Sequence, residues 1–388
     1  MVPLSYNLRS LAVRKTTTLA TAGGIALVVF VFSAVLMLSA GIKKTLSRSG
    51  RPDVAILLRK GSDAELSSGI ETPNVGLILA SKEVARRPDG KGDGVGEMVV
   101  VMTIEKLGTG GVSNASIRGV SDDVYDFRKS VKIIDGRKAR PGSDECVVGR
   151  AIRGRFKGVE LGQSFELRKN RMAKIVGVFE DDGSSFESEI WADTDTIRSA
   201  FGREGIVQSV RARLSDPAQF DSFKRSIESN RQLGVQVWRE TDYYEKQSEG
   251  TSLFITSLGT VVAFFFAVGA MIGAMITMYS AVSNRKREIG VLRALGFGKL
   301  AIMTSFLLES VFLALLGGVI GALASLAMGL VHFSMVNFQS WSEMVFSFEP
   351  TPKTILSGLV FATAMGLLGG LFPAVRAARM PLIQALKE

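Results

Sequence analysis

The sequence predicts a membrane α-helical protein with four transmembrane helices and an α+β extracytoplasmic domain inserted between the first and second spans. Composition is the first observation behind this fold class: 46% of the 388 residues are hydrophobic and 22% are charged. This is too apolar for an average soluble protein and too polar for a chain that lies wholly in lipid. The second observation is four apolar stretches, each long enough to cross a bilayer core of about 30 Å. The third is a long soluble-type segment between the first two stretches.

The distribution of charge fixes the expected topology. The net charge is +10, yet residues 42–250 hold 35 basic and 32 acidic residues, and the short segments assigned to the cytoplasm together carry +9. Basic residues concentrate on the cytoplasmic side of membrane proteins. We therefore expect a multi-pass membrane protein with both termini in the cytoplasm, and no nucleic-acid partner.

The N-terminal region predicts a surface helix followed by a span. Residues 1–15 mix leucines with arginine and lysine, which is typical of an amphipathic cytoplasmic helix on the inner membrane surface. Residues 16–42 carry no charge and form the first expected transmembrane helix. A cleaved signal peptide is the alternative, but the run is too long for a typical signal core and lacks a clear small-residue cleavage pattern.

We expect residues 43–249 to form the extracytoplasmic domain. Apolar runs with turn-rich flanks predict strands at 54–58, 98–104, 116–120, 145–148, 164–167, 173–179 and 209–214. Apolar spacings of three and four residues predict helices at 81–86, 193–201 and 217–231. The polar segment 240–249 should be a helical stalk that returns the chain to the membrane.

The second expected span, residues 250–284, is 35 residues without a charge, more than the roughly 20 that a bilayer needs. The excess should emerge on the cytoplasmic side as a helical extension. Gly269 and Gly273 form a small-xxx-small pair that permits close helix packing.

A basic connector, residues 285–299, follows. Its five positive charges and one negative charge place it in the cytoplasm. Ile289, Leu292 and Leu295 recur at three-residue steps, which predicts a short helix, and Gly296 and Gly298 supply a turn. An ordinary basic anchoring loop would explain the charge but not the aliphatic spacing or the paired glycines.

The third expected span, residues 300–331, contains Glu309. A charged side chain inside the hydrocarbon costs roughly 2.5–3.5 kcal/mol on insertion scales, so this carboxylate needs a partner, a water-filled groove or protonation. A proton relay is one interpretation; a structural carboxylate facing neighbouring helices is the favoured one. We expect residues 332–353 to be an external loop, residues 354–375 to be the fourth span and residues 376–388 to be a cytoplasmic tail.

The sequence carries no motif for catalysis in this chain. It has no G-x-x-x-x-G-K-[ST] phosphate-binding loop, so it should not hydrolyse ATP itself. Its one histidine, His332, and one cysteine, Cys146, remove the usual zinc sites, histidine-dependent triads and an intrachain disulfide. We therefore assign no catalytic residue, no cofactor site and no metal site.

Three stretches resemble a known family. The strings REIGVLRALGF (287–297) and FLLESVFLALLGGVIG (306–321), with the tail FPAVRAARMPLIQALKE (372–388), resemble the FtsX/MacB-like permease subunits of ABC transporters, the type VII mechanotransmission family. The string IDGRKARPGSDECVVGRAI (134–152) and the sequence that follows it to Trp191 resemble the extracytoplasmic core domain of MacB-type permeases.

The resemblance implies a location in the inner membrane of a bacterium, partners and a function. The 285–299 connector would couple to a cytoplasmic ATPase, present in two copies, which binds the ATP and Mg²⁺. A second permease, identical or related, would complete the assembly, and a periplasmic adaptor protein and membrane lipid are further expected partners. The output would be export of a lipid-linked molecule, peptide or drug; the alternative is an FtsX-like regulator that activates an extracytoplasmic partner without cargo. The residues carried over to ATPase coupling are Arg287, Glu288, Ile289, Leu292, Arg293 and Gly296.

Overall fold

The computed structural model describes residues 15–108, 110–337 and 340–381. The chain folds into two units. One is a helical unit made of the chain up to residue 41, residues 253–331 and the chain from residue 347; the other is an α+β unit made of residues 42–252 and 332–346. The amphipathic helix expected over residues 1–15 lies outside the described residues, except for Lys15, at which α2 begins.

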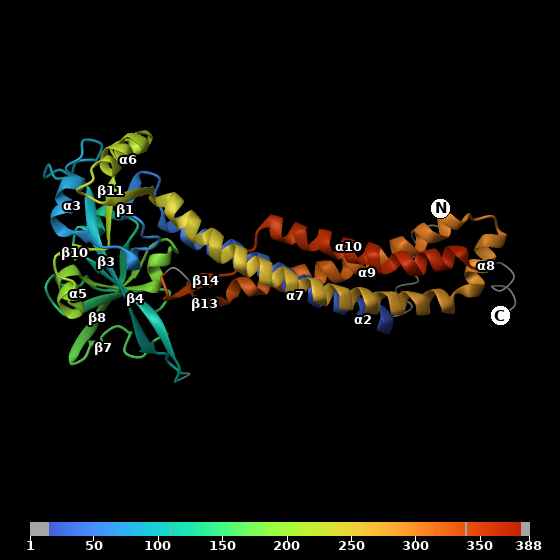
Figure 1. The fold of residues 1–388 in the computed structure, drawn as a ribbon. Coiled ribbons are helices and arrows are strands. Elements are labelled where there is room, and N and C mark those ends of the chain that lie inside the picture. The colour runs from blue at the N-terminus through green and yellow to red at the C-terminus, as the bar shows by residue number, and fades with distance from the viewer. Residues whose placement is uncertain (1–14, 109, 338–339, 382–388) are drawn as a thin grey trace. The chain divides into compact units, whose positions relative to one another are not determined.

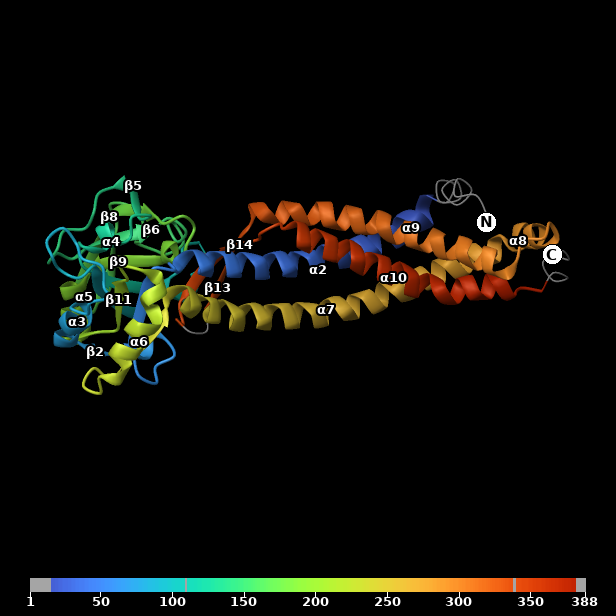
Figure 2. The same cartoon turned by 90° about the horizontal axis from the view of Figure 1, so that it is seen from above.

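The helical unit confirms the membrane part of the predicted fold class. Its elements are α2 (Lys15–Ser49), α7 (Glu240–Asn284), α8 (Lys286–Ala294), α9 (Lys299–Leu326), η4 (Ala327–Leu330) and α10 (Pro352–Arg379), and the long helices run side by side (Figures 1 and 2). Within the described residues, four helices are long and apolar enough to cross a membrane. Both α2 and α7 extend into the α+β unit by their residue numbers, because the boundaries fall after residues 41 and 252.

Glycines let these helices approach backbone to backbone. A Cβ at Gly317 or Gly321 of α9 would lie 2.5 Å from the carbonyl oxygen of Ala22 or 2.3 Å from that of Ala26, both on α2. A Cβ at Gly366 of α10 would lie 2.6 Å from Ala314 of α9. Small residues therefore bring α2, α9 and α10 together by van der Waals packing, as expected where lipid gives no hydrophobic driving force between helices.

The α+β unit is built on one ten-stranded sheet. The strand order is β12-β1-β11-β3-β4-β9-β6-β8-β5, with β7 paired to β8. The strands of this sheet are β1 (Val54–Arg59), β3 (Gly94–Glu105), β4 (Val112–Val120), β5 (Lys132–Gly136), β6 (Glu145–Gly149), β7 (Ser164–Arg168), β8 (Arg171–Glu180), β9 (Glu189–Asp193), β11 (Ser209–Arg213) and β12 (Val235–Arg239). Most pairs are antiparallel, while β4–β9 and β6–β8 are parallel.

The long strand β3 divides this sheet into two lobes. Its first residues, Gly94–Glu97, pair with β11, and the rest pair with β4. The β1/β11/β12 lobe has a core around Leu57, and the β4/β6/β8/β9 lobe has a core around Ile117. The remaining elements of the unit are η1 (Glu65–Ser67), β2 (Ile70–Glu71), α3 (Thr72–Leu79), α4 (Val124–Phe127), η2 (Ser185–Ser188), α5 (Thr194–Phe201), β10 (Ile206–Val207), η3 (Pro217–Gln219) and α6 (Phe220–Ser229).

One local prediction about this unit was wrong, and a second segment contains strands that the sequence did not indicate. The helix predicted at 81–86 is absent; those residues form turns and an isolated bridge between Val84 and Leu214, and the nearest helix is α3. The segment 332–353, expected as an external loop, instead contains a hairpin of β13 (His332–Val336) and β14 (Glu343–Ser347). Its residues 332–346 belong to the α+β unit.

The hairpin is held by specific contacts with the β4 lobe. Val345 is buried in that lobe's core, and its N–H donates to Ser188 Oγ at 3.1 Å. Lys106 Nζ lies 2.8 Å from Glu343, which is also buried. Sequence periodicity missed this because the stabilising partners lie more than 150 positions away along the chain.

Candidate functional site

The first candidate site is the basic connector, and it begins with a buried arginine. Arg285 lies between α7 and α8 and is only 6% exposed. Its Nη1 donates to Glu309 Oε2 of α9 at 2.9 Å, and its Nε donates to Glu288 Oε2 of α8 at 2.9 Å. The guanidinium carbon also lies 5.4 Å from the ring centroid of Phe306. The carboxylate that the sequence places inside the third span therefore has a cationic partner.

The other end of α8 is attached to α10. Arg293 Nη1 donates to the carbonyl oxygens of Met380 at 3.1 Å and Ala378 at 3.4 Å, beside the C-terminus of α10. A cation is favourable there because the last carbonyls of a helix carry partial negative charge. Gly296, at φ +93°, forms the turn after α8, in a backbone conformation that favours glycine.

The six residues assigned to ATPase coupling fall into two groups. Ile289 is buried in a cluster with Met278, Ile302 and Ala374, and Leu292 and Arg293 are half-buried. Arg287, Glu288 and Gly296 are exposed. Exposed beside them are two apolar side chains that the sequence reasoning did not select, Val291 at 48% and Leu295 at 71%.

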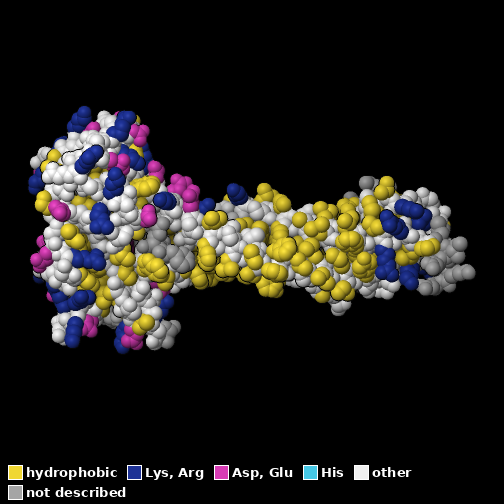
Figure 3. Space-filling view, in the orientation of Figure 1, with side chains coloured by type: hydrophobic (Ala, Val, Ile, Leu, Met, Phe, Trp, Pro, Cys, Tyr) yellow, Lys and Arg dark blue, Asp and Glu magenta, His cyan; other side chains and the backbone are white. Residues whose placement is uncertain are grey.

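The connector therefore has an inner face fixed to its own unit and an outer face that is exposed. The outer face, defined here as Arg287, Glu288, Val291 and Leu295, combines charge with exposed aliphatic surface. In Figure 3, lysine and arginine side chains gather at the end of the helical unit where Figure 1 labels α8, and hydrophobic side chains cover much of the rest of that unit. The role of these residues in coupling stays a prediction.

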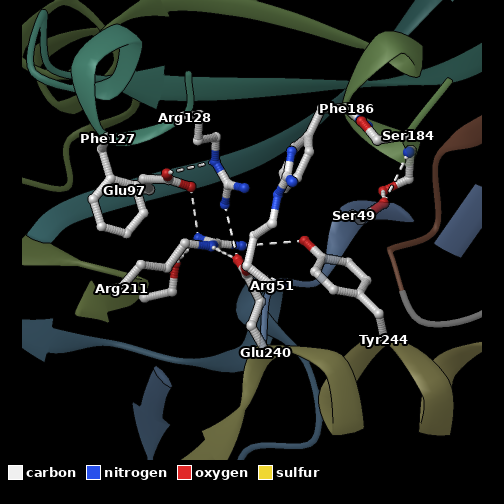
Figure 4. Close-up of polar contacts among 12 residues, drawn as sticks. Ser49, Arg51, Glu97, Phe127, Arg128, Ser184, Phe186, Arg211, Glu240 and Tyr244 are labelled. Atoms are coloured by element: carbon white, nitrogen blue, oxygen red, sulfur yellow. Dashed lines mark hydrogen bonds and ion pairs between the residues drawn. The ribbon is translucent and has the colours of Figure 1, made fainter. Parts of the chain in front are cut away.

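A second candidate site lies in the α+β unit and is a buried ionic cluster. Figure 4 shows part of it, in which the side chains of Glu97, Arg128, Arg211 and Glu240 point toward one another. Every member is less than 9% exposed. Burying this many charges is favourable only when each is paired and hydrogen-bonded. The ionic cluster consists of Glu65, Glu97, Arg118, Arg128, Glu189, Arg211 and Glu240.

Arg118 is the member that joins the two lobes. From β4 it makes a bidentate pair with Glu189 of β9, with both N–O distances 2.7 Å. Its Nη1 also donates to Glu97 of β3 at 2.8 Å and to Glu65 of η1 at 3.0 Å. Bidentate guanidinium–carboxylate pairs are strong and directional, so this arginine fixes the relative positions of four elements.

Arg211 of β11 joins the same carboxylates to the start of α7. Its Nη1 lies 2.6 Å from Glu97 and 2.9 Å from Glu65, and its Nε donates to Glu240 at 2.9 Å. Arg128 Nη2 donates to the same oxygen of Glu240 at 2.9 Å. Glu240 is the first residue of α7, where a carboxylate is also favoured by the helix dipole.

The end of α2 is held beside this cluster. The backbone N–H of Arg51, two residues after α2, donates to the second oxygen of Glu240 at 3.0 Å. Ser49 Oγ accepts from the N–H of Ser185 at 2.9 Å, and Arg48 Nη1 donates to the carbonyl of Asp182 at 2.9 Å. The two helices that enter the α+β unit are therefore anchored to its sheet by charged and polar contacts.

The electrostatics of the cluster favour the ionised state. Burial opposes ionisation of Glu65, but Arg118 and Arg211 more than offset it and hold its pKa far below the usual range. Burial likewise opposes ionisation of Glu97, but Arg211, Arg118 and Arg128 outweigh it and lower the pKa of this carboxyl. Across the described residues no group of three or more His, Cys, Asp or Glu side chains could hold a metal ion.

Sequence reasoning missed the cluster, although a signal exists. Arg118 lies in the run SIRGV and Arg211 in SVRAR, where a charge interrupts an otherwise apolar strand. A charge in a strand that is buried on both faces must be paired. The sequence does not say with which carboxylates, because the partners are 21 to 146 positions away.

Comparison with protein families matches two models to the chain. The MacB-like periplasmic core domain matches residues 16–230, and the FtsX-like permease C-terminal domain matches residues 260–382.

Curated relatives include the macrolide export ATP-binding/permease protein MacB 2 of Yersinia pestis, 30% identical over 223 residues, covering 55% of this chain and 32% of that protein. The MacB protein of Acinetobacter baylyi is 26% identical over 291 residues, covering 71% of this chain and 43% of that protein. The chain thus spans between about a third and less than half of the length of these relatives.

Comparison with solved structures returned matches that include two extracytoplasmic domains. The extracellular domain of the ABC-type transporter YknZ from Gram-positive bacteria covers 48% of this chain and 99% of its own, with 15% identity and a TM-score of 0.36. The periplasmic region of MacB from Actinobacillus actinomycetemcomitans covers 51% of this chain and 94% of its own, with 11% identity and a TM-score of 0.37.

Proposed function

Because this chain belongs to the MacB/FtsX-like family of ABC transporter permeases, with a MacB-like periplasmic core domain and an FtsX-like C-terminal region, we propose that it couples ATP hydrolysis by a separate cytoplasmic ATPase to movement of its α+β unit. Two ATPase copies would bind the ATP and Mg²⁺. The α+β unit would lie in the periplasm, and both termini and α8 would lie in the cytoplasm of a bacterium.

The observation that carries this proposal is the double attachment of α8. Arg285 ties its start to Glu309 of α9, and Arg293 ties its end to the last carbonyls of α10. The segment is thus fixed at both ends to two long helices, and charged and aliphatic side chains are exposed between these ends. A force applied to the segment would therefore move the two helices and would not simply bend the segment. This is the property that a coupling helix requires.

Contacts in the α+β unit also support the proposed transmission of movement, because they attach α2 and α7 to the sheet. Glu240 and the residues just after α2 are held by the ionic cluster, and α7 is one helix from Glu240 to Asn284. A tilt of α7 would therefore carry the sheet with it. Since the cluster joins both lobes through Arg118, we propose that the lobes move as one body.

The proposed partners follow from the surfaces of α8 and α7. The outer face of α8 would bind the ATPase, with Arg287 and Glu288 pairing with opposite charges and Val291 and Leu295 in apolar contact. A second permease, identical or related, would pack against α7, whose apolar stretch is 22% buried, less than those of the other three spans. A periplasmic adaptor protein would bind the α+β unit.

We propose export as the output, with a lipid-linked molecule, peptide or drug as cargo handled on the periplasmic side. The names of the matched relatives describe macrolide export, and the periplasmic core model spans most of the domain. The alternative output is mechanical activation of an extracytoplasmic partner without cargo. Proteins that co-purify with the full chain distinguish the two, because export predicts an adaptor and regulation predicts an enzyme of the cell wall.

The experiment that tests the coupling role changes only exposed residues of α8. The variant Val291→Glu/Leu295→Glu should lose ATPase co-purification and permease-stimulated ATP turnover, because two carboxylates would be buried in the contact. The charge reversals Arg287→Glu and Glu288→Lys should each weaken both readouts. A matched control is Leu77→Glu, which replaces a similarly exposed leucine (54%) on α3 of the α+β unit.

Unchanged co-purification and ATP turnover in the α8 variants, with normal folding, would overturn the assignment. The proposed topology has its own test. A cysteine introduced at Arg287, in a chain whose Cys146 is replaced by serine, should resist a membrane-impermeant thiol reagent on intact cells and react after the cells are opened. Labelling on intact cells would place α8 on the far side of the membrane and refute the proposal.

A further inference from the structure

The helical unit contains a cavity of about 270 Å³ beside the start of α8. This is close to the lower end of the range typical of ligand pockets, roughly 300–1,000 Å³. It is open to the surface and is lined by the first turns of α2, the last turns of α7 and the middle of α9. Its lining residues are Thr16, Thr18, Thr21, Thr277, Met278, Ser280, Ala281, Asn284, Glu309 and Leu313.

The lining is rich in polar side chains although it lies among long apolar helices. Five hydroxyl groups, one amide and one carboxylate face this space. Thr21 Oγ1 donates to Thr277 Oγ1 at 3.0 Å across α2 and α7. Glu309 is 3% exposed and is oriented by Arg285. Polar side chains in membrane helices are costly unless they face a hydrated cavity or a polar ligand, and they mark functional sites.

Exposed apolar side chains continue from the cavity along the same helices. On α2, Leu19 is 68% exposed and Leu27 is 60% exposed; two helical turns separate them, so they share one face. On α7, Ile272 is 51% exposed and Ile276 is 64% exposed, one turn apart and just before Thr277. A polar pocket next to exposed aliphatic helix surface matches a molecule with a polar head and hydrocarbon chains.

We propose that this cavity binds the headgroup of a phospholipid with a primary amine, a phosphoethanolamine lipid. The ammonium has three N–H donors, which the Glu309 carboxylate and the Asn284 carbonyl oxygen can accept. A carboxylate has about four lone-pair sites, so Glu309 can bind Arg285 and the ammonium together. The phosphate oxygens accept hydrogen bonds from the threonine and serine hydroxyls, and the acyl chains lie along Leu19 and Ile276.

The chemistry selects the amine. A quaternary choline headgroup has no N–H to donate, so it leaves the acceptors of Glu309 and Asn284 without a ligand donor. An anionic headgroup without an amine presents no cationic N–H donor, so it cannot form a charge-assisted hydrogen bond to the Glu309 carboxylate. A phosphoethanolamine headgroup presents a donor group and an acceptor group together, as the lining does.

Bound lipid would contact α2, α7 and α9 where Arg285 connects α7 to α8. It would therefore stabilise the arrangement of the three helices from which the proposed coupling helix starts. If α8 lies in the cytoplasm, as the proposed function has it, the lipid belongs to the cytoplasmic leaflet. That assignment rests on the proposed function, whereas the binding itself does not. Failure of lipid binding and failure of ATPase coupling are thus separate results.

The test is native mass spectrometry of the purified full chain, delipidated in detergent and titrated with phosphatidylethanolamine, phosphatidylcholine or phosphatidylglycerol of matched chains. We expect one tight site for phosphatidylethanolamine, and at least tenfold weaker binding of the other two lipids at that site. The variant Ser280→Val/Asn284→Leu should weaken phosphatidylethanolamine binding at least tenfold, because it removes lining groups whose side chains are exposed and therefore tolerant of substitution.

The matched control is Ser283→Val, an exposed α7 residue outside the lining, which should bind lipid as the parent does. A thermal unfolding midpoint within a few degrees of the parent shows that each variant is folded. Equal binding of the three lipids overturns the headgroup assignment. Parent-like phosphatidylethanolamine binding by the folded double variant, or no tight site in the parent, overturns the cavity as the lipid site.

Discussion

Arg285 Nη1 and Glu309 Oε2 lie 2.9 Å apart, and this pair joins the beginning of α8 to the interior of α9 across 24 positions of sequence. Both side chains are more than 90% buried. The pair therefore supplies the cationic partner that a glutamate in an apolar helix needs, and it fixes the start of α8 to α9.

We expect Arg285→Met to destabilise the folded chain by about 3–5 kcal/mol, because it leaves the Glu309 carboxylate buried without its cation. The double variant Arg285→Met/Glu309→Met should recover much of that loss, since two apolar side chains replace the pair. Unfolding of the purified chain in detergent, arranged as a double-mutant cycle, measures the coupling.

Arg287→Met is the matched control, because Arg287 is exposed and its replacement should change stability by less than about 0.5 kcal/mol. If Arg285→Met cost no more than this control, the ion pair would contribute nothing to the attachment of α8.

The sequence predicted that Glu309 needs a partner, but it did not identify which residue that partner is. Hydropathy and charge are local properties of the sequence. They suffice to predict the four spans and the short helix between the second and third spans. Whether a basic residue of the connector points outward or folds back is decided by packing across helices. Arg293 illustrates this limit: the family resemblance gave it the same expected role as Arg287, whereas in the structure its guanidinium donates to a carbonyl oxygen at the end of α10.

A second prediction concerns the ionic cluster. Glu240→Gln removes the charge that Arg128 and Arg211 share at the start of α7, and we expect a loss of about 3–5 kcal/mol of stability. Glutamine has nearly the same size as glutamate, so the loss of stability would be due to the lost charge and not to a change in side-chain volume. Limited proteolysis should then cleave first near the junctions that follow α2 and precede α7.

Glu249→Gln is the control for Glu240→Gln. Glu249 is an exposed glutamate of the same helix, and its replacement should leave both stability and the proteolysis pattern unchanged. Equal behaviour of the two variants would show that Glu240 does not anchor α7.

The cluster and the β13–β14 hairpin show why part of the α+β unit escaped prediction. Alternation found β1, β6 and β8 because each has a local apolar pattern. The hairpin has an equally readable strand, Glu343–Ser347, but its place in the unit depends on Val345 entering a core built by residues 98–197. No property of the loop by itself indicates that this distant core has room for a valine.

A third prediction is a loss of stability in acid. The folded-state pKa values of Glu65 and Glu97 lie below the ordinary glutamate value of about 4.3. Hydrogen bonds from Arg137 likewise lower the pKa of Glu145 to about 2. Groups with lowered pKa values stabilise the folded state above the unfolded-state pKa, and that contribution disappears as pH falls toward the folded-state value, because the unfolded chain binds more protons.

Titration of these glutamates should therefore change the thermal unfolding midpoint of the purified chain little between pH 7 and about pH 5. Below about pH 4.3 the midpoint should fall steadily. Glu145→Gln should make the decline between that pH and about pH 2 shallower, because the amide does not titrate. A midpoint that rose on acidification through this range would contradict the ionised cluster.

The last prediction compares two glycines of the helical unit. Gly317 of α9 faces α2 so closely that a Cβ would lie 2.5 Å from the Ala22 carbonyl oxygen and 3.0 Å from the Ile25 Cβ, whereas a Cβ at Gly269 of α7 would meet nothing within 4 Å. We expect Gly317→Ala to cost about 1–3 kcal/mol by forcing the helices apart. Gly269→Ala should be neutral or stabilising by up to about 1 kcal/mol, since alanine favours helix.

Unfolding in detergent measures both variants against the parent, and light scattering measures their oligomeric state. Gly269→Ala leaves the contacts of a single chain intact, so any loss of a dimer in this variant would locate the second permease on the open face of α7. If the two substitutions had the same effect on the stability of the single chain, the close approach of α2 to α9 would be refuted, because only that approach distinguishes the two sites.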